Sequence, residues 1–275
     1  MRDIQVVTDS TAYISKEYAR ENGIDIVPLS VEFNGETKPE GYPGEFNDFY
    51  NKLKTSESFP KTSQPSVGAF RKVFERAIKN DKEIIVILIS SKLSGTYNSA
   101  KLASTMVNEK KISIIDSKTS ASNLKTLVNI AVNMNKKDFT RQEIVDNINE
   151  EKNKMSIYLT VHKLDYLYKG GRLSASQALL GSLLKIRPVI GLIDGELVPV
   201  KKLRGKNKAL NYMIDIIPED VKRISICYIL NYDFAKKIKR KLEKKFKDVE
   251  ITIDELGPVI GAHLGPNSLG LCYSV

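Results

Sequence analysis

The sequence has very few residues of the kinds that bind metals or form disulfides. Of its 275 residues, two are cysteine and two are histidine. Cys227 and Cys272 do not form a C-x-x-C pair, and neither an H-x-H nor an H-E-x-x-H motif occurs. These absences exclude the usual zinc sites and redox pairs. We therefore expect no metal, and two reduced cysteines that pack as small apolar side chains.

Long apolar runs and phosphate-binding loops are also missing. The apolar run at 83–90, EIIVILIS, is too short to cross a bilayer. The first residues, MRDIQVVTDS, lack the basic-then-apolar order of a signal peptide, so we expect a cytoplasmic protein. The sequence has no G-x-x-x-x-G-K-[ST] or G-x-G-x-x-G motif and no magnesium-binding part of a kinase. We therefore expect no cofactor and no phosphoryl transfer from ATP by this chain alone.

Positive charge exceeds negative charge, with a formal net charge of +10 concentrated at 201–208 and 235–247. A basic surface can attract nucleic acid. In the second run, however, Ile238, Leu242 and Phe246 recur four residues apart, which predicts an amphipathic helix with a solvated basic face. We favour that interpretation and expect no nucleic-acid partner. Nucleic-acid binding remains as an alternative.

The order of predicted elements indicates an α/β protein of two domains. Up to about residue 153, strands such as 4–10 and 83–90 alternate with helices, which predicts an N-terminal three-layer α/β/α domain with a mainly parallel sheet. Strands dominate the remainder, and Asp194-Gly195 marks a tight hairpin between two of them. A hairpin pairs antiparallel strands, so this part is predicted to be a C-terminal α/β domain with a mixed sheet. We place the domains at 1–153 and 154–275.

Local signals predict several further element boundaries. Residues 24–33 are predicted as one strand, and residues 174–184 as a helix capped by Ser174. Serine just before a helix usually caps its N-terminus, which explains Ser66 and Ser117.

Hydroxyl side chains cluster where the predicted parallel strands end, at 8–11, 90–96 and 116–117. Ligands bind at this edge of a parallel sheet. The stretch at 90–96, SSKLSGT, has more hydroxyls than one helix cap requires. Ser94 could be a nucleophile if His263 acted as its base, although the G-x-S-x-G motif of hydrolases is absent. Alternatively, the hydroxyls could bind an anion such as a carboxylate.

Six motifs follow one another along nearly the whole chain: TDST (8–11), TSQPS (62–66), SSKLSGTYNSA (90–100), DSKTSAS (116–122), YLYKGGRLSASQALLGSLLKIRPVIG (166–191) and GPVIGAHLGP (257–266). Together they resemble the DegV family of bacterial fatty acid-binding proteins, the acyl-carrying subunits of a fatty acid kinase. The resemblance implies that a long-chain fatty acid lies buried between two α/β domains. Where that family usually has glycine after the last motif, this chain has Asn267.

The resemblance also implies roles for individual residues. The fatty acid carboxylate would be held by Thr62, Ser94 and His263. The supporting pocket residues would be Ser10, Ser63, Gly95 and Thr96. Arg172 of the G-G-R turn would contact a separate ATP-binding kinase subunit, which phosphorylates the bound carboxylate for phospholipid synthesis. The chain itself would then be non-catalytic, with transient membrane contact during lipid exchange. The alternative is an acyl ester hydrolase that uses Ser94 and His263.

Overall fold

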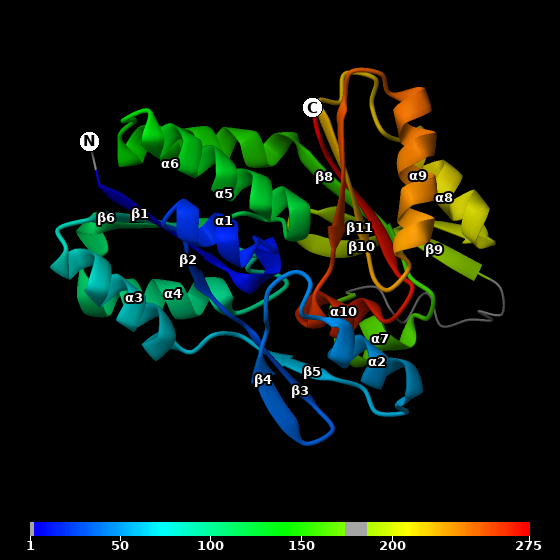
Figure 1. Cartoon of the computed structure of the whole chain (residues 1–275), viewed down its shortest axis with the longest axis horizontal. Helices are drawn as coiled ribbons and strands as arrows, with labels where there is room; N and C mark the ends of the chain where they lie inside the picture. The colour runs from blue at the N-terminus through cyan, green and yellow to red at the C-terminus, as the bar shows by residue number, and fades with distance from the viewer. Residues whose placement is uncertain (1–2, 174–185) are drawn as a thin grey trace.

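The computed structural model describes residues 3–173 and 186–275, so the predicted helix at 174–184 and its cap Ser174 lie outside the described residues. The strands form one parallel, one mixed and one small antiparallel sheet (Figure 1). The parallel sheet belongs to the first half of the chain and the mixed sheet to the second half. The predicted fold class, two α/β domains, is confirmed, while the boundary at 153/154 stays a prediction.

The parallel sheet has four strands in the order β2 (Asp25–Val27), β1 (Ile4–Asp9), β6 (Glu83–Leu88), β7 (Ile112–Asp116). Its helices are α1 (Lys16–Glu21), α3 (Val67–Lys79), α4 (Thr96–Val107), α5 (Ala121–Lys136) and α6 (Arg141–Glu151), with short 3₁₀ turns η1 (Ser10–Ala12), η2 (Glu109–Lys111) and η3 (Lys152–Lys154). Side chains alternate along β6, so Ile84 and Val86 pack against α3 and α4, while Ile85 and Ile87 pack against α1, α5 and α6. Figure 1 shows the two helical layers on opposite faces of the sheet, which explains the continuous apolar run of β6.

The mixed sheet has six strands in the order β10 (Glu196–Arg204), β9 (Ile186–Ile193), β8 (Met155–Thr160), β13 (Leu269–Ser274), β11 (Arg223–Tyr228), β12 (Glu250–Glu255). Only the β11–β12 pair is parallel. Asp194 and Gly195 join β9 to β10 with φ of 48° and 82°, the positive values that a tight hairpin turn requires. Helices α8 (Lys206–Asp215) and α9 (Tyr232–Lys245) pack on one face of this sheet. Helix α9 buries Ile238 and Leu242 and exposes most of its lysines, so the amphipathic prediction is confirmed.

The third sheet corrects the prediction for residues 24–33. The chain breaks at Pro28 into β2 of the parallel sheet and β3 (Ser30–Phe33), which pairs antiparallel with β4 (Glu36–Pro39) and β5 (Lys61–Ser63). Proline has no backbone N–H to donate to a neighbouring strand, so Pro28 stands where the chain leaves the parallel sheet and enters the small antiparallel sheet. The sequence did not reveal β4 and β5 because they are short and largely exposed. Helix α2 (Asn47–Thr55) connects β4 to β5 along the chain.

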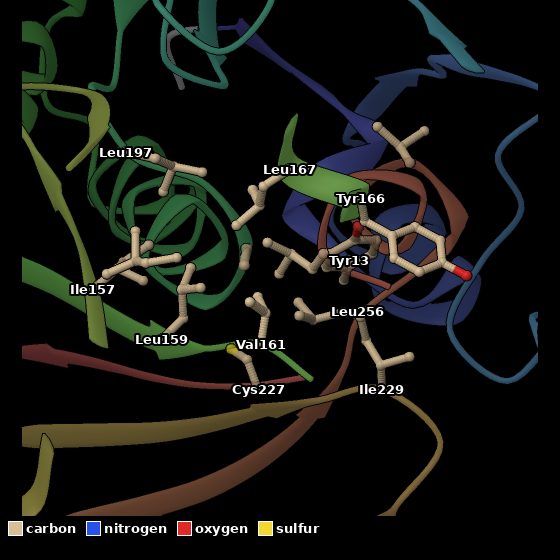
Figure 2. Packing of buried hydrophobic residues seen from close by; sticks show 14 of the residues in the cluster. Tyr13, Ile157, Leu159, Val161, Tyr166, Leu167, Leu197, Cys227, Ile229 and Leu256 are labelled. Atoms are coloured by element: carbon tan, nitrogen blue, oxygen red, sulfur yellow. The ribbon is translucent and has the colours of Figure 1, made fainter. Parts of the chain in front are cut away.

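An apolar cluster joins the two domains and the small sheet. It includes Tyr13, Phe46 and Tyr50 from the first half of the chain, and residues along β8, α7 (Asp165–Lys169) and α10 (Pro258–Leu264) from the second. Figure 2 shows Ile157 and Leu159 of β8 and the following Val161 with Leu197 close by, and Tyr13 in the same group. The cluster places α7, α10 and β5 beside one another, where the candidate site is found.

Both cysteines are reduced and buried, as the sequence predicted, and their sulfur atoms lie 3.4 Å apart. Ser66 caps α3 by accepting a hydrogen bond from the Ala69 amide at 3.1 Å, so that prediction is confirmed. The prediction for Ser117 is wrong, because α5 begins after Ser120 and the Ser117 hydroxyl bonds to the backbone of Thr119 instead. Among the helices that the structure describes, none combines the length and hydropathy needed to cross a membrane.

Candidate functional site

Residues of both domains line a cavity of about 350 Å³, within the range of about 300–1,000 Å³ that is typical of ligand pockets. Most of its wall is aliphatic and comes from β8, the β9–β10 hairpin, α10 and the ends of strands in the first domain. These apolar residues are Leu29, Ile89, Leu93, Ile157, Leu159, Leu192, Leu197, Val259, Ile260 and Leu264. A wall of this kind favours a hydrocarbon chain, at roughly 0.8 kcal/mol for each buried methylene.

The same cavity also has polar residues. They are Thr62, Ser63, Gln64, Ser94, Ser120, Arg172 and His263. They come from β5 and the residue after it, the loop after β6, the start of α5, the segment after α7, and α10. An apolar body with a small polar group fits an amphiphile better than a fully polar or fully apolar ligand.

Thr62 and His263 lie 201 residues apart in the sequence and are brought together by the fold. The Thr62 Oγ1 lies 2.7 Å from the Nε2 of His263. The His263 ring packs against Gly170, where an added Cβ would lie 2.2 Å from Nδ1. The first glycine of the G-G-R turn is therefore required because a side chain there would displace the histidine.

His263 is neutral near pH 7. Burial, with a smaller effect from the Arg172 charge, lowers its pKa from 6.5 to about 4. Its Nδ1 is buried and has no hydrogen-bond partner among the described residues, and a buried acceptor is more often left unpaired than a donor. We therefore assign the proton to Nε2, which donates to Thr62. The Thr62 hydroxyl proton then remains available to donate to a ligand.

The hydroxyls of the stretch at 90–96 have separate tasks. Ser90 donates to the carbonyl of Gly195 at 2.7 Å and so ties the first domain to the β9–β10 hairpin. Ser91 donates to the Asp116 carboxylate at 2.5 Å. Of these three serines, only Ser94 lines the cavity, and its hydroxyl lies 2.8 Å from that of Thr96. Most of the cluster is thus structural, and one hydroxyl faces the ligand space.

The predicted supporting residues divide into three groups. Ser63 lines the cavity beside Thr62. Gly95 and Thr96 lie behind the wall, where Thr96 is buried and holds the Ser94 hydroxyl. Ser10 does not line this cavity, because its hydroxyl donates to Glu40 at 2.6 Å and accepts from the Leu29 amide. Ser10 thus holds the entry to β3 in place.

Arg172 lies at the cavity rather than on an exposed turn. Its Nη1 donates to the Gly170 carbonyl at 2.7 Å, and its Nε donates to the Leu93 carbonyl of the other domain at 3.2 Å. These bonds hold the guanidinium near His263 and beside the loop that carries Ser94. Its positive charge can therefore also favour a bound carboxylate.

The geometry does not favour a nucleophile–base pair. The Nε2 of His263 bonds to Thr62, and the described residues include no hydrogen bond between Ser94 and His263. The Nδ1 of His263 has no carboxylate to orient it within the part of the chain that the structure describes. Both relationships are needed for an activated serine.

Sequence reasoning missed two residues of the site, Gln64 and Ser120. The Gln64 amide donates to Ser99 at 2.9 Å and covers Gly95, where a Cβ would lie 1.9 Å from its Oε1. Ser120 is buried before α5 and makes no capping hydrogen bond with its side chain. Gln64 lies in the motif at 62–66 and Ser120 in the motif at 116–122. Their position within these motifs was the one sequence signal that they belong to the site.

The fold and the cavity define a two-domain α/β protein with an amphiphilic pocket between its domains. The family model described as "Uncharacterised protein, DegV family" matches residues 3–275. The chain is 38% identical over 281 residues to a DegV domain-containing protein of Halalkalibacterium halodurans, covering 100% of this chain and 99% of that protein. It is 34% identical over 277 residues to protein DegV of Bacillus subtilis, covering 98% and 99%. The chain therefore belongs to the DegV family.

Solved structures agree with this assignment. DegV from Bacillus subtilis, described as a fatty acid binding protein, superposes with a TM-score of 0.89 at 33% identity over 100% of this chain and 99% of that one. A stearic acid-binding protein from Eubacterium ventriosum gives a TM-score of 0.87 at 28% identity over 100% and 98%. A DegV lipid binding protein from Thermotoga maritima gives 0.88 at 31% identity over 100% and 99%.

Proposed function

We propose that this protein binds a long-chain fatty acid in the cavity between its domains and holds the carboxylate with the hydroxyls of Thr62 and Ser94, while His263 orients the Thr62 hydroxyl. The observation that carries the proposal is the pairing of Thr62 with His263 at a cavity whose remaining wall is largely aliphatic. The descriptions of the Bacillus subtilis and Eubacterium ventriosum proteins as fatty acid binders support it.

The aliphatic wall and the polar residues make different contributions to binding. Each methylene that leaves water contributes about 0.8 kcal/mol, so the tail supplies most of the binding free energy. Each hydrogen bond to a charged group contributes about 1.5–3 kcal/mol. The hydroxyls thus fix the position of the carboxylate, and the Arg172 charge offsets part of the cost of burying it.

We further propose that the chain is non-catalytic and presents this carboxylate to a separate ATP-dependent fatty acid kinase, for acyl-phosphate formation in phospholipid synthesis. The sequence supports this because it has no ATP-binding motif. We assign the contact with the kinase to Arg172, which lines the cavity and donates to the Leu93 carbonyl of the other domain. Exchange of the lipid would involve transient contact with a membrane, and the site of action would be the cytoplasm.

Binding is tested by denaturing extraction of the purified protein and mass spectrometry of the organic phase, followed by titration of lipid-free protein with fatty acids. Thr62→Val and Ser94→Ala should each weaken binding about 10- to 100-fold, since each removes one hydrogen bond to a charged group. Thr37→Val makes the same change as Thr62→Val on an exposed residue of the same small sheet, and should leave binding unchanged. Equal affinity for Thr62→Val and wild type would contradict the assignment of the carboxylate site.

Kinase presentation is tested separately with lipid-loaded protein and a purified fatty acid kinase subunit. Arg172→Ala should weaken docking to the kinase and lower acyl-phosphate formation, while Lys163→Ala, an exposed charge nearby in sequence, should have little effect. Normal docking by Arg172→Ala would remove the docking role of this residue. Turnover of an acyl ester by the chain alone would favour the hydrolase alternative instead.

A further inference from the structure

A second, smaller cavity lies on the other face of the six-stranded sheet, away from the fatty acid cavity. Side chains alternate along β8, so Leu159 faces the large cavity and Thr160 faces the opposite side. The small cavity measures about 40 Å³. Its polar lining consists of Thr160, His162, Arg187, Lys206 and Asn267. None of these residues lines the large cavity.

The titratable groups at this cavity are all basic. Lys206 has a pKa lowered by burial and then by Arg187. His162 has a pKa lowered by burial and then by the charges of Arg187, Lys163 and Lys206. Within the described part of the chain, neither Arg187 nor Lys206 forms a salt bridge with a carboxylate. The cluster therefore carries positive charge that the protein itself leaves uncompensated.

Two of these basic groups are fixed in place. Arg187 donates through Nη1 to the carbonyls of Val161 and His162, and through Nη2 to the Nδ1 of His162 at 2.7 Å. Arginine can only donate, so Nδ1 accepts and the neutral imidazole carries its proton on Nε2 as a further donor. The Lys206 Nζ stands 3.3 Å from the centre of the Phe234 ring. Lys206 also begins α8, whose cap Gly205 provides no side-chain hydrogen bond, so the positive end of that helix adds to the field.

Thr160 provides an independent indication of a ligand. It is 6% exposed, and its Oγ1 is buried without a hydrogen-bond partner among the described residues. Buried hydroxyls are nearly always paired, because an unpaired one loses its hydrogen bonds to water without replacement. Asn267, with a left-handed φ of 60° that asparagine tolerates well, provides an amide at the same cavity.

We propose that this cavity binds a phosphate-class oxyanion, supplied either as free phosphate or as the phosphate monoester of a lipid head group. One water needs about 10–15 Å³ of such space, so the cavity accepts a group of only a few heavy atoms. Several charged or polar donors that converge on one small volume suit the many acceptor oxygens of phosphate. The site is separate from the fatty acid cavity and does not depend on the function proposed for it.

The test is calorimetric titration of the full-length protein with inorganic phosphate at constant ionic strength, balanced with sodium chloride. Lys206→Met keeps the aliphatic stem over Phe234 and removes the charge, and we expect at least a tenfold loss of affinity. Lys208→Met removes the same charge from an exposed position on the same helix and should change affinity less than twofold. Thr160→Val should weaken phosphate binding and raise the melting temperature of the free protein, because it removes an unpaired hydroxyl.

The choice of ligand distinguishes the two sources of the anion. Saturable binding of inorganic phosphate identifies free phosphate as a ligand. Binding to phosphatidic acid vesicles but not to phosphatidylcholine vesicles, without binding of inorganic phosphate, identifies a lipid head group. The proposal is overturned if neither binds, if Lys206→Met and Lys208→Met weaken binding equally, or if Thr160→Val binds phosphate as well as wild type. Fatty acid titration of each variant should match wild type, so failure here stays distinct from failure of the lipid site.

Discussion

His263 should make the stability of the lipid-free protein depend on pH between about 4 and 6.5. Its pKa is lowered from 6.5 to about 4, because burial and then the Arg172 charge disfavour the charged ring. In this window the unfolded chain binds a proton that the folded protein does not. The stability contributed by neutral His263 is therefore fully present above pH 6.5 and is lost as the pH falls towards about 4.

The size of this effect follows from the two pKa values. At about 1.36 kcal/mol for each pH unit, the interval from 6.5 to about 4 corresponds to an upper limit of about 3 kcal/mol. Glu40 acts in the opposite direction over much of the same range, because burial raises its pKa from 4.5 to about 7. The pH profile of the wild type is thus a sum of opposing contributions, and a variant is needed to isolate His263.

The measurement is urea unfolding of lipid-free wild type and His263→Gln, followed by circular dichroism at several pH values from 7.5 to 4.5. Glutamine can still donate to Thr62 but does not titrate in this range. We expect the wild type to lose about 2–3 kcal/mol relative to His263→Gln as the pH falls across this range. Saturation with fatty acid should reduce the difference, because a nearby carboxylate stabilises the charged ring.

A constant difference between wild type and His263→Gln at all pH values would refute this reasoning. It would mean that the ring is solvated or protonated in the folded protein. The assignment of Thr62 as a neutral donor to the ligand would then fail as well, because it depends on a neutral His263 with its proton on Nε2.

Three further predictions concern the framework of the site. Gly170→Ala should weaken fatty acid binding at least tenfold in a titration, since its Cβ would lie 2.2 Å from the His263 Nδ1 and 2.9 Å from the Tyr166 carbonyl; unchanged affinity would show that the ring can move without cost. Gly195→Ala should lower stability more than Gly35→Ala in thermal unfolding, because both have a φ of 82° but only Gly195 would place a Cβ 2.4 Å from the Ser90 Oγ; equal losses would leave only backbone strain, about 1–3 kcal/mol each. The wild type should lose stability as the pH rises from about 4.5 through about 7, and Glu40→Gln should abolish this loss because glutamine does not titrate. The same dependence of stability on pH in the variant would argue against a buried neutral Glu40.

Much of the fold could be predicted from hydrophobic pattern and turn chemistry. The apolar run of β6 and the Asp194-Gly195 hairpin are strong local signals, and both sheets they predict are present. The small sheet of β3, β4 and β5 could not be predicted, because β4 has no buried residue and β5 has three residues. Only β3 buries apolar side chains, Val31 and Phe33, while β4 and β5 are held mainly by pairing with it, which no local pattern records. Pro28 was the one local sign that residues 24–33 are divided between two sheets.

The site was predicted less completely, for a related reason. Motif membership located Thr62, Ser94 and His263 at one cavity, yet nothing in sequence spacing shows that Thr62 bonds to His263 rather than to Ser94. The same uncertainty applied to Ser10, whose hydroxyl holds Glu40 instead of facing the cavity. A hydroxyl at the end of a strand can bond to a ligand, to a carboxylate or to the other domain, and only the packing decides which.

Arg172 connects the two parts of the proposed function. Its Nε and Nη1 hold the loop of Ser94 and the turn of Gly170, and its charge helps to keep His263 neutral. Replacement by alanine should therefore raise the pKa of His263 as well as remove a docking group. Fatty acid binding by Arg172→Ala separates these roles: if affinity stays near wild type while kinase docking fails, the arginine acts mainly at the partner surface. If affinity falls along with docking, its main contribution is to position the carboxylate site from within.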